Sequence, residues 1–327
     1  MKTPWQQQLI ECTLDAHDLL KILSIDPADV NLDTHTSFPL RVSQDFIRRM
    51  EPGNPRDPLL LQVLPTYQER LTVAGFSDDP LGEKTANKMP SLLHKYHGRV
   101  LLIPIGSCAV NCRYCFRRNF PYQKNLFSRQ QLVHIMEYLH QDPSIHEVIL
   151  SGGDPLVAKD DLLAALIQSL ATIPHLKYLR IHTRLPIIIP DRVTRTLTDA
   201  LTSTQLKCTV VIHCNHPNEI SPNVTKALNQ LTTHGISLLN QSVLLKDVND
   251  NPHTLMELSH KLYKNNVIPY YLHLLDPVQG TAHFAVDEAE GKKILQHLRH
   301  HLPGYLVPRF VKEVAGAKSK TLIDQPF

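Results

Sequence analysis

The sequence predicts an α/β protein whose main part is an incomplete barrel of six βα units, with a helical extension before it and a short segment after it. From residue 99 onward, strand-like apolar runs and amphipathic helical stretches recur about every thirty residues, which is typical of repeated βα units. These runs are apolar along their whole length, as in a parallel sheet covered by helices. The length of 327 residues suits one barrel-type domain with an extension.

The helical extension is expected to span residues 1–98. Helical patterns occur at 7–23 and 43–50, and a stretch rich in proline, glycine and asparagine at 51–58 predicts a turn. The sequence pattern changes to βα repeats at residue 99, where we place the boundary between the extension and the barrel.

The barrel is expected to span residues 99–304 and the last segment residues 305–327. The six predicted strands are 100–105, 147–150, 178–182, 208–213, 237–245 and 268–275. Two of the connecting helices carry start signals: Ser128 and Gln131 have the capping-box spacing at the start of 128–140, and Pro222 occupies the first turn of 222–234. A seventh extended stretch, 305–312, opens the last segment.

Composition excludes several classes of protein. With 42% hydrophobic and 20% charged residues, the chain is neither disordered nor fibrous. A net charge of +3, from 34 basic and 31 acidic residues spread along the chain, gives no sign of nucleic-acid or membrane binding. No apolar run approaches the roughly 18 residues of a membrane span, and the first residues do not resemble a signal peptide. We therefore expect a cytoplasmic protein.

Three of the six cysteines form a cluster that follows the first predicted strand, with the spacing Cys108-x-x-x-Cys112-x-x-Cys115. Three thiolates in eight residues can surround one metal centre. A structural zinc ion would need a fourth ligand, whereas a four-iron cluster on three thiolates keeps one iron open for chemistry. The spacing favours an iron–sulfur cluster over zinc, and loops after parallel strands are where such folds place catalysis.

The loop 106–115, Gly-Ser-Cys-Ala-Val-Asn-Cys-Arg-Tyr-Cys, resembles the cluster loop of the radical S-adenosylmethionine (SAM) superfamily. The resemblance implies that Cys108, Cys112 and Cys115 hold a [4Fe–4S] cluster whose open iron binds SAM and cleaves it to a 5′-deoxyadenosyl radical. It also implies that Tyr114 contacts the adenine. The superfamily's fold is a partial (β/α)6 barrel, in agreement with the six units counted above.

A glycine pair follows the second predicted strand in residues 150–155, Leu-Ser-Gly-Gly-Asp-Pro. Alone it is an ordinary strand-to-helix turn, but beside a radical SAM loop it resembles the turn that binds the methionine part of SAM. The residues concerned are Ser151, Gly152, Gly153 and Asp154. His213, at the end of the fourth strand, has a similar implied place near SAM, with a structural histidine as the alternative.

Longer sequence matches resemble the lysine 2,3-aminomutases, from about residue 51 to residue 320. The matching segments are 95–102, 112–118, 215–219, 240–245 and 269–271. The branch most similar is the short enzyme that makes (R)-β-lysine for modification of elongation factor P. This resemblance implies an isomerase that moves the amino group of L-lysine from C2 to C3.

The aminomutases also use pyridoxal 5′-phosphate bound to a lysine near the C-terminus. The motif in 312–321 implies that Lys320 is this lysine, with Lys318 as the competing choice. Arg99 and Lys95, just before the first strand, and Gln241 match positions that hold the phosphate of the cofactor. The alternatives are a basic surface turn for Arg99 and Lys95 and polar packing at a strand end for Gln241.

The substrate residues implied by the family carry the charges that lysine needs. Arg117 could grip the substrate carboxylate with two parallel hydrogen bonds, and its neighbour Arg118 is expected to be a surface charge. Asp276 and Glu313 match positions that contact the distal ammonium group. The alternatives are a turn aspartate before Pro277 for Asp276 and a surface glutamate at a strand end for Glu313. An acidic pair favours lysine over glutamate, although the longer enzymes carry aspartate where this chain has Glu313.

The family also implies partners: L-lysine, an electron donor such as flavodoxin or ferredoxin, and a ligase acting on elongation factor P. The longer relatives bind an intersubunit metal through cysteines, at one of which this chain has Asn251. We therefore expect no structural zinc and a weaker or different homo-oligomer. The alternatives are another amino-acid 2,3-aminomutase, such as a catabolic or glutamate enzyme, a non-catalytic iron–sulfur or zinc protein, and a radical enzyme that modifies nucleic acids.

Overall fold

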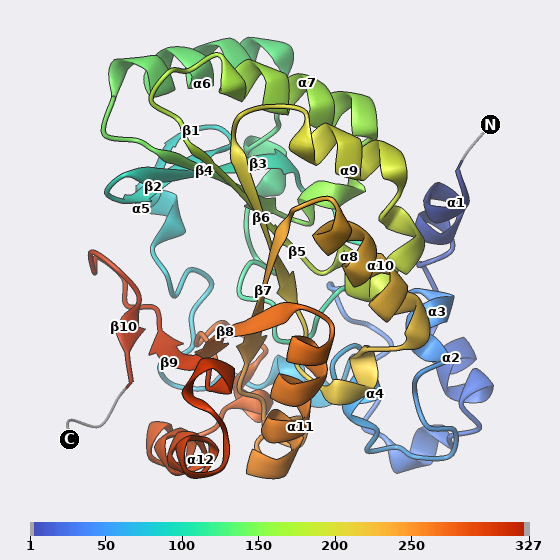
Figure 1. Ribbon diagram of the computed structural model, residues 1–327. Coiled ribbons are helices and arrows are strands. Elements are labelled where there is room, and N and C mark those ends of the chain that lie inside the picture. Colours follow the sequence, from blue (N-terminus) through green and yellow to red (C-terminus); the bar gives the residue numbers. More distant parts are fainter. Residues whose placement is uncertain (1–2, 324–327) are drawn as a thin grey trace.

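The computed structural model describes residues 3–323, so the outermost ends of the predicted first and last segments, 1–2 and 324–327, lie outside it. Figure 1 shows a curved sheet with helices around its outside. The strands are β1 (Asn87–Met89), β2 (Leu92–Tyr96), β3 (Arg99–Ile105), β4 (Glu147–Gly152), β5 (Tyr178–Thr183), β6 (Lys207–His213), β7 (Ser237–Val243), β8 (Val267–His273), β9 (Arg309–Lys312) and β10 (Thr321–Leu322).

The helices that connect the barrel strands are α6 (Arg129–Gln141), α7 (Asp160–Ala171), α8 (Leu185–Ile188), α9 (Arg195–Thr202), α10 (Pro222–Thr233), α11 (Pro252–Lys264) and α12 (Glu288–His301). The extension contributes α1 (Pro4–Ile10), α2 (Ala16–Ile22), α3 (Gln44–Ile47), α4 (Pro58–Leu61) and α5 (Glu83–Ala86). No helix among the described residues is both long and apolar enough to cross a membrane.

The strands lie in sequence order from β1 to β10, and the ladder from β3 to β9 is parallel throughout. Short antiparallel strands extend the sheet at both edges. At one edge β2 pairs with β3 and β1 with β2, and at the other β10 pairs with β9. β1 and β10 each pair with one neighbour, so within the described residues the sheet stays open. The predicted incomplete α/β barrel is confirmed.

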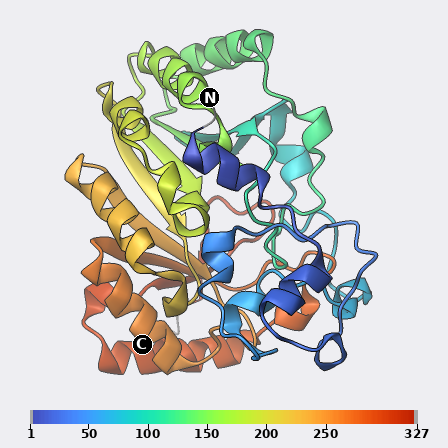
Figure 2. The same cartoon turned by 90° about the vertical axis from the view of Figure 1, so that its right-hand side faces the viewer.

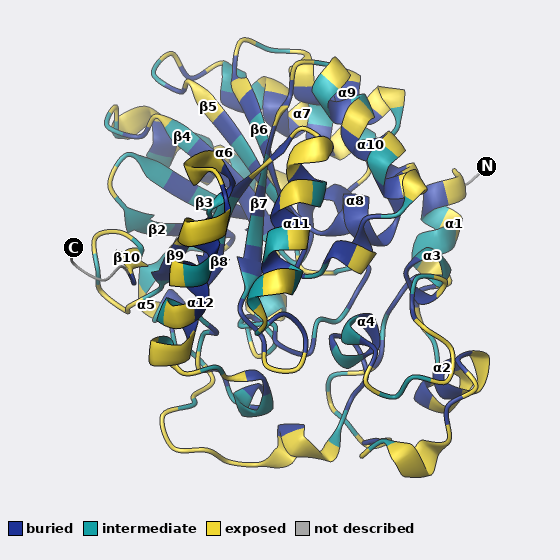
Figure 3. Cartoon of the chain, turned by 60° about the horizontal axis from the view of Figure 1, so that its bottom comes forward, coloured by how far each residue is buried: buried dark blue, intermediate teal, exposed yellow. Residues whose placement is uncertain are grey.

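Apolar burial explains why these segments form a helix-covered sheet. In Figure 3 the strands are mainly dark blue, whereas the connecting helices carry yellow, exposed residues on their outer sides. On β6, for example, Val210, Val211 and Ile212 are all buried, because one face meets the helices and the other the barrel interior. The continuous apolar runs of the sequence are the signature of this double burial.

The structure confirms both helix starts that the sequence predicted. The Ser128 hydroxyl accepts a hydrogen bond from the Gln131 amide at 3.1 Å and starts α6, and Pro222 is the first residue of α10.

The extension differs from its prediction in two ways. The pattern at 7–23 is two helices rather than one, because Thr13 forms an isolated β-bridge with Arg41 and the Asp15 side chain then caps α2 by accepting a hydrogen bond from the His17 amide. The stretch 87–96 forms β1 and β2, so the sheet begins before residue 99. Lys95 is therefore within β2 rather than in a turn before the first strand.

The extension packs directly on the barrel. Its apolar residues, from Trp5 to Leu64, belong to the same buried cluster as the strands and helices of the barrel. Figure 2 shows these segments, in blue, against the side of the barrel. The extension therefore helps to shape the loops at the carboxyl ends of the strands.

Candidate active site

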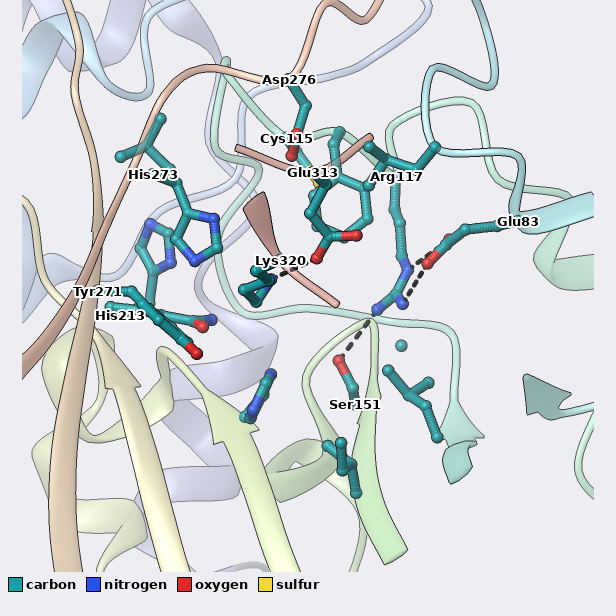
Figure 4. A pocket seen from close by; sticks show the side chains of 18 of the residues that line it. Glu83, Cys115, Arg117, Ser151, His213, Tyr271, His273, Asp276, Glu313 and Lys320 are labelled. Atoms are coloured by element: carbon teal, nitrogen blue, oxygen red, sulfur yellow. Dashed lines mark hydrogen bonds and ion pairs between the residues drawn. The ribbon is translucent and has the colours of Figure 1, made fainter. Parts of the chain in front are cut away.

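A cavity of about 510 Å³ lies where the parallel strands end. Figure 4 shows side chains from both halves of the chain pointing into it. Every site residue predicted from the sequence lines this cavity: Lys95, Arg99, Cys108, Cys112, Tyr114, Cys115, Arg117, Ser151, Gly152, Gly153, Asp154, His213, Gln241, Asp276, Glu313 and Lys320. The strands from β3 to β9 bring these residues together because parallel strands place all their carboxyl ends at one edge.

The cysteine loop follows β3 and is held by the extension. The amide of Asn111 donates to the Arg41 carbonyl at 3.0 Å, and that of Arg113 to the Gln62 carbonyl at 2.9 Å. Burial and the neighbouring thiols raise the pKa of the Cys108 thiol, and burial raises that of Cys115 to about 11. Among residues 3–323, no group of three or more histidine, cysteine, aspartate and glutamate side chains is arranged to hold a metal ion. The thiols of Cys108, Cys112 and Cys115 nevertheless all line the cavity.

The prediction that Arg118 is a surface charge is wrong. Its side chain is only 8% exposed and donates to Glu69 Oε2 at 2.6 Å and to the Gly280 carbonyl at 3.1 Å. Arg113, which is completely buried, shares the same carboxylate. Glu69 comes from the extension, and a single sequence gives no signal of such a distant partner.

The glycine turn after β4 packs on the cysteine loop. The Asp154 amide donates to the Ser107 carbonyl at 2.9 Å, and a Cβ on Gly153 would lie 2.4 Å from the same oxygen. Gly152 has a φ of +112°, which only glycine adopts without strain. The glycine pair therefore lets the two loops touch, and both glycines line the cavity together with the three cysteines.

The Asp154 side chain points into the protein rather than into open space. Its carboxylate accepts hydrogen bonds from the Thr183 hydroxyl and from the amides of Leu156, Arg184 and Leu185. Burial nevertheless raises its pKa above the usual range. Asp154 thus fixes the end of β5 against the turn after β4.

Tyr114 and His213 form a stacked pair beside the thiols. Their ring centroids are 5.6 Å apart with 15° between the planes, and Tyr114 Oη lies 3.1 Å from His213 Nε2. Burial lowers the pKa of His213 to about 3, so its imidazole is neutral. Gln241 lies beside His213 in the register of β6 and β7.

Lys320 enters the cavity just before β10, which is anchored by its pairing with β9. Its Nζ forms an ion pair with Glu313 and lies 5.6 Å from the centre of the Tyr271 ring. Figure 4 shows Lys320 between Glu313 and Tyr271. The competing Lys318 is exposed and does not line the cavity.

Glu313 and Asp276 form the acidic side of the cavity. Glu313 binds two ammonium groups, that of Lys320 and that of Lys95 at 3.0 Å. Although burial opposes it, this pairing lowers the pKa of Glu313 well below its usual range. Burial, followed by the charge of Glu313, raises the pKa of Asp276 to about 7.

Arg117 is clamped by a residue that sequence reasoning missed. Glu83, on α5, accepts from Nε and Nη2 of Arg117 at 2.8 and 2.7 Å, and Ser151 accepts from Nη1 at 3.0 Å. Burial opposes the charge of Arg117, but the Glu83 carboxylate overrides it and raises the pKa of the guanidinium. Two of the five guanidinium N–H groups, one on each terminal nitrogen, remain for another acceptor.

Comparison with known proteins decides the family. Residues 102–258 match the model of the radical SAM superfamily. L-lysine 2,3-aminomutase of Escherichia coli is 48% identical over 98% of this chain and 94% of its own length. The enzymes of the same name from Haemophilus influenzae and Buchnera aphidicola are 47% and 42% identical over 97% and 99% of this chain, and over 95% and 96% of their own lengths. The chain belongs to the L-lysine 2,3-aminomutase family. It is therefore an isomerase, and its superfamily implies a [4Fe–4S] cluster and SAM.

The cavity lining of this aminomutase also includes polar residues that were not predicted, among them Glu83, His182, Arg184 and His273. His182, Arg184 and His273 lie at or just after the carboxyl ends of β5 and β8. Parallel βα folds place their chemistry at these ends, so the positions of the predicted strands could have pointed to these three residues. Nε2 of His182 and of His273 is buried without a hydrogen-bond partner in the described part of the chain. Burial lowers the pKa of both histidines well below the usual range, so both imidazoles are neutral.

Proposed function

We propose that this chain converts L-lysine into β-lysine by moving the amino group from C2 to C3, with pyridoxal 5′-phosphate on Lys320. One observation carries the proposal: Lys320, near the C-terminus, lines the same cavity as the three cysteine thiols. A reaction that needs a radical source and an amine-bound carbonyl cofactor requires both at one place.

The residues present suit the groups that the reaction needs. Cys108, Cys112 and Cys115 would hold the cluster, and the turn 151–154 with Tyr114 and His213 would hold SAM. Gln241 would help to hold the phosphate of pyridoxal phosphate. When bound, the cluster and SAM supply a radical that removes a hydrogen atom from the substrate, and pyridoxal phosphate supplies the carbonyl that carries the migrating nitrogen. All of these residues line one cavity, which supports the assignment.

Basic side chains that line the cavity together with Lys320 suit the phosphate of the cofactor. Arg99 lies 4.9 Å from the centre of the Tyr96 ring, and Arg180 has a buried Nε without a partner in the described residues. Lys95 is held by Glu313 and lies on the same side of the cavity. A dianion would attract all three cations.

The substrate would be bound through both of its ends. Arg117 would hold the carboxylate with its two free N–H groups, which point away from the Glu83 clamp. Asp276 and Glu313 would hold the distal ammonium group. Glu313 already binds two ammonium groups, the chemical group that a lysine side chain brings. The enclosing strands and loops would also keep water from a carbon radical.

The test is anaerobic incubation of the reconstituted protein with SAM, dithionite, pyridoxal phosphate and L-lysine, followed by chromatography. We expect β-lysine, no product from Cys112→Ser, and product from the control Cys208→Ala, because buried Cys208 does not line the cavity. Conversion of glutamate or ornithine but not of lysine would overturn the assignment of the acidic pair and favour another aminomutase.

We further propose that the product is (R)-β-lysine and that it supplies a ligase acting on elongation factor P, with flavodoxin or ferredoxin as the reductant. Similarity over nearly the whole length of the short relatives supports this. Chiral chromatography gives the configuration. A mass increase of elongation factor P on addition of the ligase and the enzymatic product, absent with L-lysine alone at the same concentration, tests the link.

A further inference from the structure

Arg184, just after β5, connects the cysteine loop to a buried carboxylate. Its side chain is only 6% exposed. Nη1 lies 2.8 Å from Cys112 Sγ and 2.5 Å from Tyr114 Oη. Nη2 donates to Glu219 Oε2 at 2.9 Å and to Gln62 Oε1 at 2.7 Å. The guanidinium therefore contacts one of the three cavity sulfurs directly.

The ion pair of Arg184 and Glu219 is fixed from both sides. The Arg184 amide donates to Asp154 at 2.7 Å. Glu219, which is completely buried, accepts from the amides of Asn215 and His216 at 2.9 and 3.0 Å. Neither residue has a part in the substrate contacts described above. Segment 215–219, which contains Glu219, matches the aminomutases in sequence, but that match by itself implies no role for it.

The guanidinium of Arg184 also carries one N–H group that has no acceptor in the described residues. This group is the buried Nε. Burying an N–H group without a partner costs about 1–3 kcal/mol, so such groups are rare unless a ligand completes them. A cluster held by Cys112 would bring further sulfur atoms next to Arg184, and sulfur is an acceptor.

Hydrogen bonds and charges at the sulfur atoms are among the factors that set the reduction potential of an iron–sulfur cluster. Reduction adds one electron and makes the cluster more negative. A cation that donates to a ligating sulfur stabilises the reduced form more than the oxidised form, and a nearby anion does the opposite.

We propose that Arg184 and Glu219 set the reduction potential of the cluster bound by Cys108, Cys112 and Cys115, Arg184 making it less negative and Glu219 limiting that effect. This rests on the proposed function, because it requires the cluster. In the reduction one electron passes from an external low-potential donor to the cluster, and no atom is transferred. Arg184 acts as a positioning residue through Cys112.

The test is a redox titration of the reconstituted protein with dithionite, without SAM, followed by the electron paramagnetic resonance signal of the reduced cluster. We expect Arg184→Met to shift the midpoint potential to a more negative value and Glu219→Gln to shift it to a less negative value. Opposite signs separate an electrostatic role from a structural one, because loosening of the site would move both variants in the same direction.

Arg192→Lys is the matched control. Arg192 is another completely buried arginine with a carboxylate partner, Asp160 at 2.7 Å, but it does not line the cavity, so its replacement should leave the potential unchanged. Shifts of the same sign in Arg184→Met and Glu219→Gln, or none beyond that of the control, would overturn the inference.

Two further outcomes are decisive. If Arg184→Met holds no cluster, Glu219→Gln decides alone, and only a less negative potential supports the inference. If neither variant holds a cluster while Arg192→Lys does, the pair serves assembly and the inference fails. A wild-type protein that binds no cluster at all would instead contradict the proposed function.

Discussion

Asp276 is a carboxyl group that lines the cavity, and in the proposed function its charge would decide substrate binding. Burial raises its pKa to about 7, Glu313 adds to the rise, and Lys320 and Lys95 oppose it. Its ionised form, which pairs with an ammonium group, therefore becomes populated only as the pH rises through neutrality.

We predict that the KM for lysine falls as the pH rises from about 6 to about 8, one unit on each side of the pKa of Asp276. Asp276→Asn should raise the KM about 10- to 100-fold, because a hydrogen bond to a charged group is worth about 1.5–3 kcal/mol, and it should flatten the pH dependence. Steady-state kinetics at fixed ionic strength measures both. An equally steep pH profile in the variant would show that another group titrates.

The same group should affect stability with the opposite sign. In the unfolded chain Asp276 ionises near its ordinary pKa of 3.8, whereas in the folded chain it stays protonated up to about 7. The folded chain holds this proton more tightly than the unfolded chain does. The resulting contribution to the free energy of unfolding is fully present below pH 3.8 and is lost as the pH rises to about 7. Asp276→Asn should remove this loss in denaturation measured without substrate or cofactor.

Lys320 and Lys318 differ in surroundings although they are two residues apart. We predict that Lys320→Ala abolishes the absorbance of bound pyridoxal phosphate after reduction with borohydride and gel filtration, whereas Lys318→Ala keeps it, because only Lys320 reaches the cavity. Retention of the absorbance in Lys320→Ala together with its loss in Lys318→Ala would reverse the assignment.

At the residue scale, motif residues could be predicted and their partners could not. The cysteine spacing and the glycine pair are local patterns, and each requires a particular chemistry or backbone. Glu83, Glu69 and Arg184 are ordinary charged residues in the sequence, and their importance arises from partners distant in the chain. A single sequence contains no record of those contacts.

At the element scale, the strands were predictable because their apolar runs report burial on two faces. The short elements were harder to predict from the sequence. β1 and β2 are only three and five residues long, and their burial is partial, so they lack the continuous apolar signal of the barrel strands. The break between α1 and α2 depends on a bridge from Thr13 to Arg41, which no local pattern reveals.

The contact between the turn after β4 and the loop after β3 can be tested through its glycine. We predict that Gly153→Ala lowers stability by about 1–3 kcal/mol and removes most of the bound iron, because the new Cβ would meet the backbone of Ser107. Gly304→Ala is the control, since no atom lies within 4 Å of a Cβ there. Chemical denaturation and iron analysis measure the two effects, and equal iron content in both variants would contradict the prediction.

At the scale of the whole molecule, the extension and the barrel form one folding unit around the cavity. They share one apolar core, and the cysteine loop receives backbone contacts from Arg41 and Gln62. The ion pairs of Glu69 with Arg113 and Arg118 add a polar connection at the same place. Loss of this connection should therefore affect both stability and cofactor binding.

We predict that Glu69→Ala lowers the free energy of unfolding by about 3–5 kcal/mol, because it leaves two buried guanidinium groups without their carboxylate. Glu290→Ala, which breaks an exposed ion pair with Lys293, should cost less than about 1 kcal/mol. Urea denaturation of both variants, with iron content measured alongside, checks this. Equal stabilities would mean that the extension is held by its apolar contacts alone, whereas a selective loss of stability and iron in Glu69→Ala would show that this carboxylate secures the cysteine loop.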